Sequence, residues 1–361
     1  MDHYEWYVTR HARTPSVQRR ISRRRRVTRR VCRATRTPRH LYLELQMDID
    51  SQTMPSTQPV FSQRILAKRV SARKFSYIVD RLSFHRLNGL AEKHLRARGH
   101  KMAVFANEHI GGFIHVFGVY EQEELDVLFS FLEPLHDVFR AGIGLDIGAN
   151  IGNHSLYFSR IFDEVHCFEP DPSTFYLLQF NVSFRKKIEA FNIGLGDEKG
   201  TFKLSEVPDN MGESVIVTGQ FEADSNVNCI DVQVDRLDNL DYHDKKLCFI
   251  KMDVEGFEPK VLRGSLRTIT THWPLIVLEQ HESDFEEGSS ESISMLRDLG
   301  YKFCWHQSGT VSRNTFVRRI FNFMEMFSGR THKVVTSESV PPGNYSMLIA
   351  VPPRFQSLLH V

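Results

Sequence analysis

The clearest pattern in the chain is an apolar alternation that runs into a glycine-rich turn. Residues 143–147 alternate apolar side chains with small residues or an aspartate, as a buried strand does. The turn, residues 148–152, has Gly, Asn and Gly at every second position, and an apolar-periodic helical segment follows at 154–162. A strand, a glycine-rich turn and a helix let backbone approach a ligand at a helix N-terminus. Asn150 fits this turn because Asn tolerates the left-handed conformation.

Further along the chain, strand and helix patterns alternate. This alternation is typical of an α/β fold with a mostly parallel sheet and helices on both faces. Three short strand patterns in the middle, 201–205, 214–218 and 227–234, interrupt the alternation and predict a separate β excursion. The remaining strands are predicted at 164–168, 188–194, 247–252, 274–278, 301–305 and 345–351, and the helices at 171–184, 256–268 and 284–299.

Residues 61–137 form a predicted N-terminal extension in front of the main domain, which spans 138–354. Apolar residues at helical spacing predict a helix over 64–98, and a second helix over 121–135. Between them, residues 102–120 alternate enough to predict a small hairpin around Gly111-Gly112. The extension either forms a wall of the substrate cleft or serves as a structural cap.

Charge is concentrated at the N-terminus. Residues 1–46 contain 13 Arg, no Lys and 3 acids, a net charge of +10, whereas the remainder carries −8. With the Ser/Thr/Pro/Gln-rich linker at 51–63, residues 1–60 are predicted to be a disordered tail. Three interpretations stay open: a non-native leader followed by a start at Met47 or Met54, a tether for nucleic acid or anionic membrane, and a transit peptide.

The cysteine and hydropathy patterns favour a cytoplasmic protein. The five cysteines are isolated, and they are interpreted as free thiols of a reducing compartment. No apolar run approaches the ~18 residues that a membrane helix needs, and no secretory apolar region follows the basic start.

An acidic residue after the second strand indicates the type of ligand. Glu169 follows the strand 164–168 and lies 23 residues after Asp146. An acid at this place in a doubly wound sheet takes the hydroxyls of a ribose. The glycine spacing is not the G-x-G-x-x-G of a dinucleotide site. An acid at the tip of the first strand repels phosphate but suits an ammonium and a sulfonium, which favours S-adenosylmethionine.

Five segments together resemble the FkbM family of S-adenosylmethionine-dependent methyltransferases. The resemblance covers roughly residues 142–307, with a weaker echo at 118–125. It implies a class I methyltransferase fold, a Rossmann-like sheet of seven mostly parallel strands, and hydroxyl acceptors. The segments are DIGANIGNHSLYFS, FEPDP at 168–172, LGDEKG at 195–200, DRLDNL at 235–240 and IKMDVEGFEPKVLRG at 250–264.

The predicted cofactor-binding residues come from the first three strand ends. Asn192 belongs to this set as a contact to the adenine edge, and capping of a turn is the equally weighted alternative. The full set is Asp146, Gly148, Asn150, Gly152, Glu169 and Asn192.

The predicted catalytic residues are Asp253 and His281, which follow two later strands. A base that takes the proton of a hydroxyl acceptor accelerates transfer by ~10²–10⁴-fold, and His suits this task near neutral pH. Asp253 is alternatively a residue that touches the amino-acid end of the cofactor. Asp253, Glu279 and His281 also offer metal ligands, but no spacing demands a metal, so none is predicted.

The acceptor is predicted to be a hydroxyl of a sugar or glycan, a lipid-linked oligosaccharide or a polyketide-type metabolite. The first alternative is an RNA methyltransferase targeted by the basic tail, although the core's net charge of −8 disfavours a phosphate-binding face. The second alternative is a catalytically silent cofactor-binding subunit. The aromatic and basic insert at 313–338 is interpreted as a helix on the sheet edge, a lid over the acceptor, or, through 313–330, a peripheral membrane contact. Acceptor identity and oligomeric state do not follow from the sequence.

Overall fold

The computed structural model describes the chain from residue 74 onward, with gaps. The predicted tail, the linker, the start of the first helix and residues 309–331 of the insert lie outside the described residues. The described ranges are 74–106, 108–205, 214–217, 229–242, 244–286, 288–308, 332–337 and 339–361.

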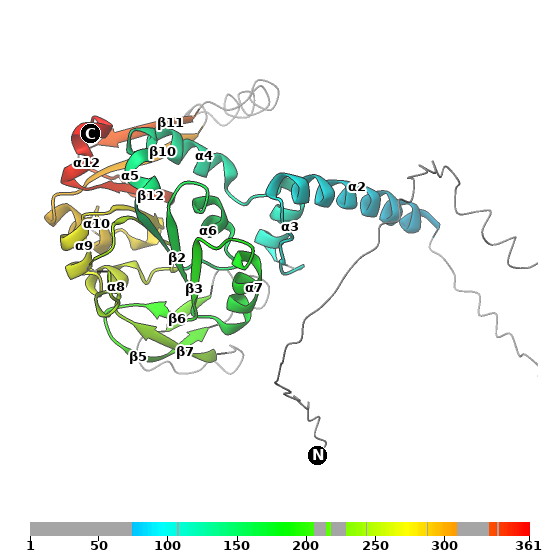
Figure 1. Cartoon of the computed structure of the whole chain (residues 1–361), viewed down its shortest axis with the longest axis horizontal. Coiled ribbons are helices and arrows are strands. Elements are labelled where there is room, and N and C mark those ends of the chain that lie inside the picture. The colour runs from blue at the N-terminus through cyan, green and yellow to red at the C-terminus, as the bar shows by residue number, and fades with distance from the viewer. Residues whose placement is uncertain are drawn as a thin grey trace, which may run out of the picture. The chain divides into compact units, whose positions relative to one another are not determined.

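A mixed sheet of eight strands forms the centre of the main domain (Figure 1). Its order is β11-β10-β12-β9-β8-β1-β2-β3, and the five strands from β9 to β3 pair in parallel. β12 and β11 run antiparallel to their neighbours. The strands are β1 (Ile143–Ile147), β2 (Glu164–Phe168), β3 (Ile188–Phe191), β8 (Leu247–Met252), β9 (Leu275–Gln280), β10 (Lys302–Ser308), β11 (His332–Ser337) and β12 (Tyr345–Val351).

The eighth strand corrects the predicted number of seven. β11 lies inside the segment 313–338, for which the sequence analysis offered only a helix, a lid or a membrane contact. Its consecutive β-branched residues, Val334, Val335 and Thr336, favour a strand, and they pair with β10 at the sheet edge. The aromatic residues earlier in the insert, rather than this short β-branched run, decided the prediction for the segment.

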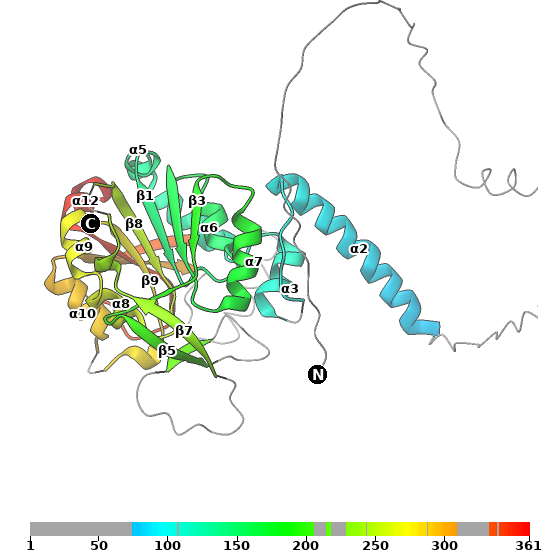
Figure 2. The ribbon, with the colours of Figure 1, turned by 60° about the horizontal axis from the view of Figure 1, so that its bottom comes forward.

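Helices cover both faces of the sheet, as predicted (Figures 1 and 2). Successive residues of a strand point to opposite faces. Accordingly, Ile276 and Leu278 of β9 join one buried core, whereas Leu275 and Val277 join another. The first core includes residues of α8 (Glu258–Arg263), α9 (Leu266–His272) and α10 (Glu291–Asp298); the second includes residues of α4 (Gln122–Phe131), α5 (His136–Arg140), α6 (Asn153–Phe158) and α12 (Pro353–Leu359). This arrangement supports the expected class I methyltransferase fold.

The β excursion forms a second sheet of four short strands between β3 and β8. Its order is β4-β7-β5-β6, and its apolar residues Leu204, Ile216 and Val232 pack into the first core. The small sheet is therefore anchored to the main sheet by shared burial. The strands are β4 (Gly194–Leu195), β5 (Gly200–Ser205), β6 (Val215–Val217) and β7 (Cys229–Asp235).

The predicted hairpin around Gly111-Gly112 is wrong, because residues His109–Phe117 form a helix, α3. Gly111 does not mark a turn. It lies where the carbonyl oxygen of Phe105 approaches so closely that an added Cβ would be 2.0 Å from it.

The predicted helices on either side of this segment are confirmed over their described parts. The first is α2 (Lys74–Arg98), whose C-terminal residues contact α3, and the second, predicted over 121–135, is α4 followed by a 3₁₀ turn at Glu133–Leu135. α7 (Pro172–Val182) follows β2, also as predicted. Within the described residues, every helix is too short or too polar to cross a bilayer.

The close approach of Gly111 to the Phe105 carbonyl can be tested against the neighbouring glycine of α3, Gly112. We expect Gly111→Ala to lower the free energy of unfolding by about 1–3 kcal/mol, because the methyl group would overlap the Phe105 carbonyl. Gly112→Ala has open space around its Cβ and should stabilise the helix by about 0.5–1 kcal/mol. Denaturant unfolding of both variants is the measurement, and equal effects would contradict the packing argument.

Candidate active site

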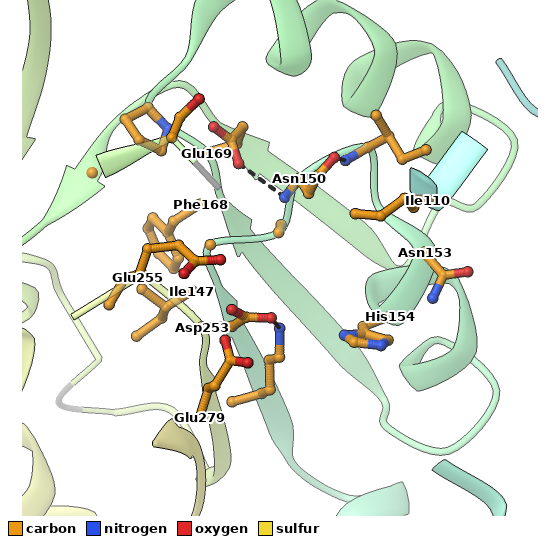
Figure 3. A pocket seen from close by; sticks show the side chains of 18 of the residues that line it. Ile110, Ile147, Asn150, Asn153, His154, Phe168, Glu169, Asp253, Glu255 and Glu279 are labelled. Atoms are coloured by element: carbon orange, nitrogen blue, oxygen red, sulfur yellow. Dashed lines mark hydrogen bonds and ion pairs between the residues drawn. The ribbon is translucent and has the colours of Figure 1, made fainter. Parts of the chain in front are cut away.

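The carboxyl ends of β1, β2, β8 and β9 meet at one cavity of about 600 Å³ (Figure 3). In open α/β sheets this is the edge at which ligands bind. The small sheet lines the cavity through Leu195, Leu204 and Ile216, and the N-terminal extension through His109, Ile110, Tyr120 and Glu121. The extension therefore contributes a wall, which is the first of its two predicted roles.

The turn after β1 is held between the two neighbouring strands. The N–H groups of Gly148 and Ala149 donate to the Phe168 carbonyl oxygen, at 3.1 and 3.0 Å. Gly148 has a φ of 77°, and a Cβ at this position would lie 1.8 Å from the carbonyl oxygen of Asp253. Asn150 has a φ of 48°, so the predicted left-handed conformation is confirmed. The close approach on both sides fixes the path of the backbone along the cavity floor.

Glu169 lines the cavity directly beside this turn. Its Oε2 accepts a hydrogen bond from the Asn150 N–H at 2.9 Å, and its Oε1 accepts one from the Asp171 N–H at 2.9 Å (Figure 3). Burial nevertheless raises the pKa of Glu169 to about 8, because desolvation outweighs the two backbone donors. Each oxygen keeps a second lone pair for a ligand.

Three of the other predicted cofactor residues support the site from outside the cavity lining. The Asn192 side chain donates to the carbonyl oxygens of Glu169 and Pro170, at 2.8 and 3.1 Å, which is the predicted turn-capping alternative. Asp146 is fully buried, and its Oδ2 accepts from the Ser155 hydroxyl at 2.5 Å. Gly152 is the N-cap of α6. By contrast, Gly148, Asn150 and Glu169 line the cavity itself.

A buried lysine that the sequence analysis missed lies next to the predicted catalytic aspartate. Lys251 is 4% exposed, and its Nζ donates to Asp253 Oδ2 at 2.7 Å. Burial alone would raise the pKa of Asp253, but the Lys251 charge and hydrogen bonds hold this pKa well below its usual range. The signal was visible in the sequence, since Lys251 is the one charged residue in the strand LCFIKM, all of whose residues are buried.

Glu279, at the end of β9, completes this group. Burial raises its pKa, and so does its hydrogen bond to the Asp253 carboxylate. Contact with Lys251 thus favours the anion of Asp253, whereas burial beside Asp253 favours the neutral form of Glu279.

His281, the second predicted catalytic residue, lies at the rim of the cavity with a side chain that is 41% exposed. Its Nε2 is 3.6 Å from Glu255 Oε2 and 3.8 Å from Glu279 Oε1. Its backbone N–H donates to Asp284 at 2.7 Å. The structure thus brings His281 and Asp253 to the same cavity, on either side of Glu279.

The side chains of Glu255, Glu279 and His281 place their possible ligand atoms within 4.8 Å of one another. Carboxylate oxygens and imidazole nitrogens bind divalent cations, so this would be the place for one. The absence of a metal from the reaction stays a prediction of the sequence.

The N-terminal wall is tied to α6. The backbone N–H and carbonyl of Tyr120 exchange hydrogen bonds with the Asn153 side chain, at 3.0 and 2.9 Å. Glu121 Oε2 lies 3.2 Å from His154 Nε2. Burial raises the pKa of Tyr120 to about 12, with Glu121 and Asp253 adding to this shift, so the phenol stays neutral.

Residues 146–303 match the family model of the methyltransferase FkbM domain. Over this segment, which is less than half of the chain, the protein is similar to the FkbM methyltransferases. Methyltransferase 1 of Beauveria bassiana is 31% identical over 153 residues, which are 37% of this chain and 60% of that protein. Methyltransferase sdnD of Sordaria araneosa is 28% identical over 192 residues, 44% of this chain and 72% of that protein. The match thus spans less than two thirds of the first relative's length.

Solved structures with a detectable likeness include an FkbM methyltransferase from Methylobacillus flagellatus, at 21% identity and a TM-score of 0.27 over 45% of each chain. The fibrillarin of Aeropyrum pernix in complex with S-adenosyl-L-methionine has 13% identity and a TM-score of 0.28, over 62% of this chain and 74% of its own. These likenesses are too weak to support any statement about the site. The expected FkbM resemblance is confirmed by the domain match.

The similarity to FkbM methyltransferases supports S-adenosylmethionine as the cofactor, and the residues of the cavity fit it. Glu169 presents free lone pairs for the two ribose hydroxyls, and the turn at 148–150 brings backbone to the cavity surface. The volume is in the usual range for small-molecule sites, ~300–1,000 Å³.

The raised pKa of Glu169 predicts a pH-dependent cost to folding. Between its ordinary value of 4.5 and about 8, the folded protein binds this proton more tightly than the unfolded chain does. Stability relative to Glu169→Gln should therefore be greatest below about pH 4.5 and fall as pH rises towards 8, by at most ~1.4 kcal/mol per pH unit. Denaturant unfolding of both proteins across this range is the measurement. A difference in unfolding free energy that does not change with pH would contradict the raised pKa of Glu169.

Proposed function

We propose that this protein is an S-adenosylmethionine-dependent methyltransferase that methylates a hydroxyl of an uncharged acceptor. The acceptor belongs to the sugars and glycans, the lipid-linked oligosaccharides or the polyketide-type metabolites. The observation that carries the proposal is the Glu169 carboxylate, held at the end of β2 against the β1 turn inside the segment that matches the FkbM domain. The bound cofactor would supply an electrophilic methyl group, and the protein would hold and align the acceptor.

His281 is the residue that takes the acceptor proton in this proposal. Asp253 is a weak base, because its contact with Lys251 lowers its pKa. His281 is partly exposed at the cavity rim, and Glu255 and Glu279 lie close to its Nε2. The Glu255 carboxylate, 3.6 Å from Nε2, would stabilise the imidazolium that forms when the ring accepts a proton.

The charges around the cavity support an uncharged acceptor rather than RNA. Among the described residues that line the cavity, Lys251 is the single lysine or arginine, and its charge is neutralised by Asp253. A phosphate backbone would therefore meet no unpaired lysine or arginine among the described residues of the lining. The carboxyl groups of the described lining are those of Glu121, Glu169, Asp253, Glu255 and Glu279.

Loss of the Glu169 carboxylate should weaken cofactor binding. We expect Glu169→Ala to raise the Kd for S-adenosylmethionine roughly 5- to 150-fold, because two hydrogen bonds to the ribose hydroxyls, worth ~0.5–1.5 kcal/mol each, are lost. Calorimetric titration is the measurement, with the exposed Glu198→Ala as a control that should bind normally. Unchanged affinity of Glu169→Ala would overturn the cofactor assignment.

Replacement of His281 should separate catalysis from cofactor binding. We expect His281→Ala to lower kcat by ~10²–10⁴-fold while the Kd for the cofactor changes less than about threefold, because the base acts only on the acceptor. Single-turnover methyl transfer together with calorimetry gives both quantities. Normal kcat in this variant would assign the base elsewhere.

The acceptor class can be tested with the full chain. The protein is incubated with methyl-labelled S-adenosylmethionine and a fractionated extract of cells that lack it. Label in a glycan, glycolipid or small-metabolite fraction supports the hydroxyl acceptor, whereas label in RNA would promote the alternative. Cofactor binding without transfer to any fraction would favour the silent subunit.

A further inference from the structure

The ion pair of Lys251 and Asp253 has no assigned role in the proposed reaction. The other residues of β8 are apolar, and all six are buried. The lysine side chain extends from this strand between two acids, with its Nζ 2.7 Å from Asp253 Oδ2 and 4.0 Å from Asp146 Oδ1. An apolar side chain could fill this buried position without needing an acidic partner.

A buried charge is costly unless it is paired, so the three side chains depend on one another. The Oδ2 of Asp146 accepts a hydrogen bond from the Ser155 hydroxyl. Its Oδ1 has no hydrogen-bond partner within the described part of the chain. Lys251 and Asp253 both line the cavity, whereas Asp146 does not. The lysine side chain is 5% exposed and that of Asp253 is 32% exposed, so the carboxylate is the more accessible member of the pair. Lys251 thus holds an accessible carboxylate of the cavity through its Oδ2.

The neighbouring Glu279 explains why such a hold is needed. Glu279 lines the same part of the cavity as Asp253 (Figure 3). Two acidic side chains next to each other disfavour a negative charge on either of them. The ammonium group of Lys251, 2.7 Å from Asp253 Oδ2, offsets this effect at Asp253.

We propose that Lys251 is a positioning residue, which fixes Asp253 as the anion that contacts the positively charged part of S-adenosylmethionine. The inference rests on the proposed function, since it assumes that this cofactor occupies the cavity. It assigns Asp253 to cofactor binding, one of its two predicted roles, and it leaves His281 as the base.

A double-mutant cycle on the full chain tests whether Lys251 acts through Asp253. The variants are Lys251→Met, Asp253→Asn and the double variant, and the measurement is the Kd for S-adenosylmethionine by calorimetry. We expect each single variant to raise the Kd at least tenfold. The Kd of the double variant should lie within about threefold of that of the single variant that binds more weakly. If Lys251 acted on the site independently of Asp253, the two losses would add, because independent effects add.

Lys199→Met is the matched control. Its Nζ contacts Asp235 at the same 2.7 Å, but this pair lies at the end of β7 and outside the cavity lining. We expect its Kd to stay within twofold of the unmodified protein. Thermal unfolding of every variant checks that binding is compared between folded proteins.

Each other outcome overturns a stated part of the argument. Additive losses, or normal binding by Lys251→Met, would remove the positioning role. Normal binding by Asp253→Asn would overturn the inference even if Lys251→Met failed to fold. If Glu169→Ala still lost affinity in that case, the proposed cofactor site would stand. Absence of binding by the unmodified protein would refute the proposed function itself.

Discussion

The site depends on the close passage of backbone at the end of β1. Gly148 lies against the carbonyl oxygen of Asp253 on one side, while its own N–H binds the Phe168 carbonyl on the other. The central strand is thereby fixed to both neighbours immediately before the cavity. Glu169 and Asp253 belong to those neighbours, so their separation is set by main-chain contacts rather than by side-chain packing. Two side chains that are distant in the sequence are in this way held on opposite sides of one ligand space.

Environment gives the carboxyl groups of the cavity different roles. Glu169 is buried and accepts two backbone donors, yet desolvation keeps its pKa high. Asp253 is partly buried, but the contact with Lys251 reverses the effect of burial on its pKa. The pKa of Glu279 is raised by burial and by the neighbouring Asp253. Residue type alone therefore does not decide which acid is charged, because the neighbouring groups do.

The sequence predicted elements correctly where a single factor, the burial of apolar side chains, determined the local structure. The strands 247–252 and 345–351 were predicted with the bounds that the structure has, because continuous apolar runs leave little choice. It failed where a residue type has two uses. Gly111 was interpreted as a turn residue, but it serves a close approach within a helix. Lys251 was passed over because one of its two partners, Asp146, comes from another strand, and only the parallel pairing of β1 and β8 brings Asp146 beside it.

The small sheet gives the cavity walls of unequal stiffness. Ser214 and Ile216 line the cavity, and Ile216 belongs to β6, which among the described strands pairs with β5 alone, along three residues. Another wall consists of strand ends from the centre of the main sheet, where each strand is paired on both sides. Few of the described hydrogen bonds must break for β6 to move. The wall of strand ends is therefore held in one shape by main-chain pairing, whereas displacement of the β6 wall costs less energy.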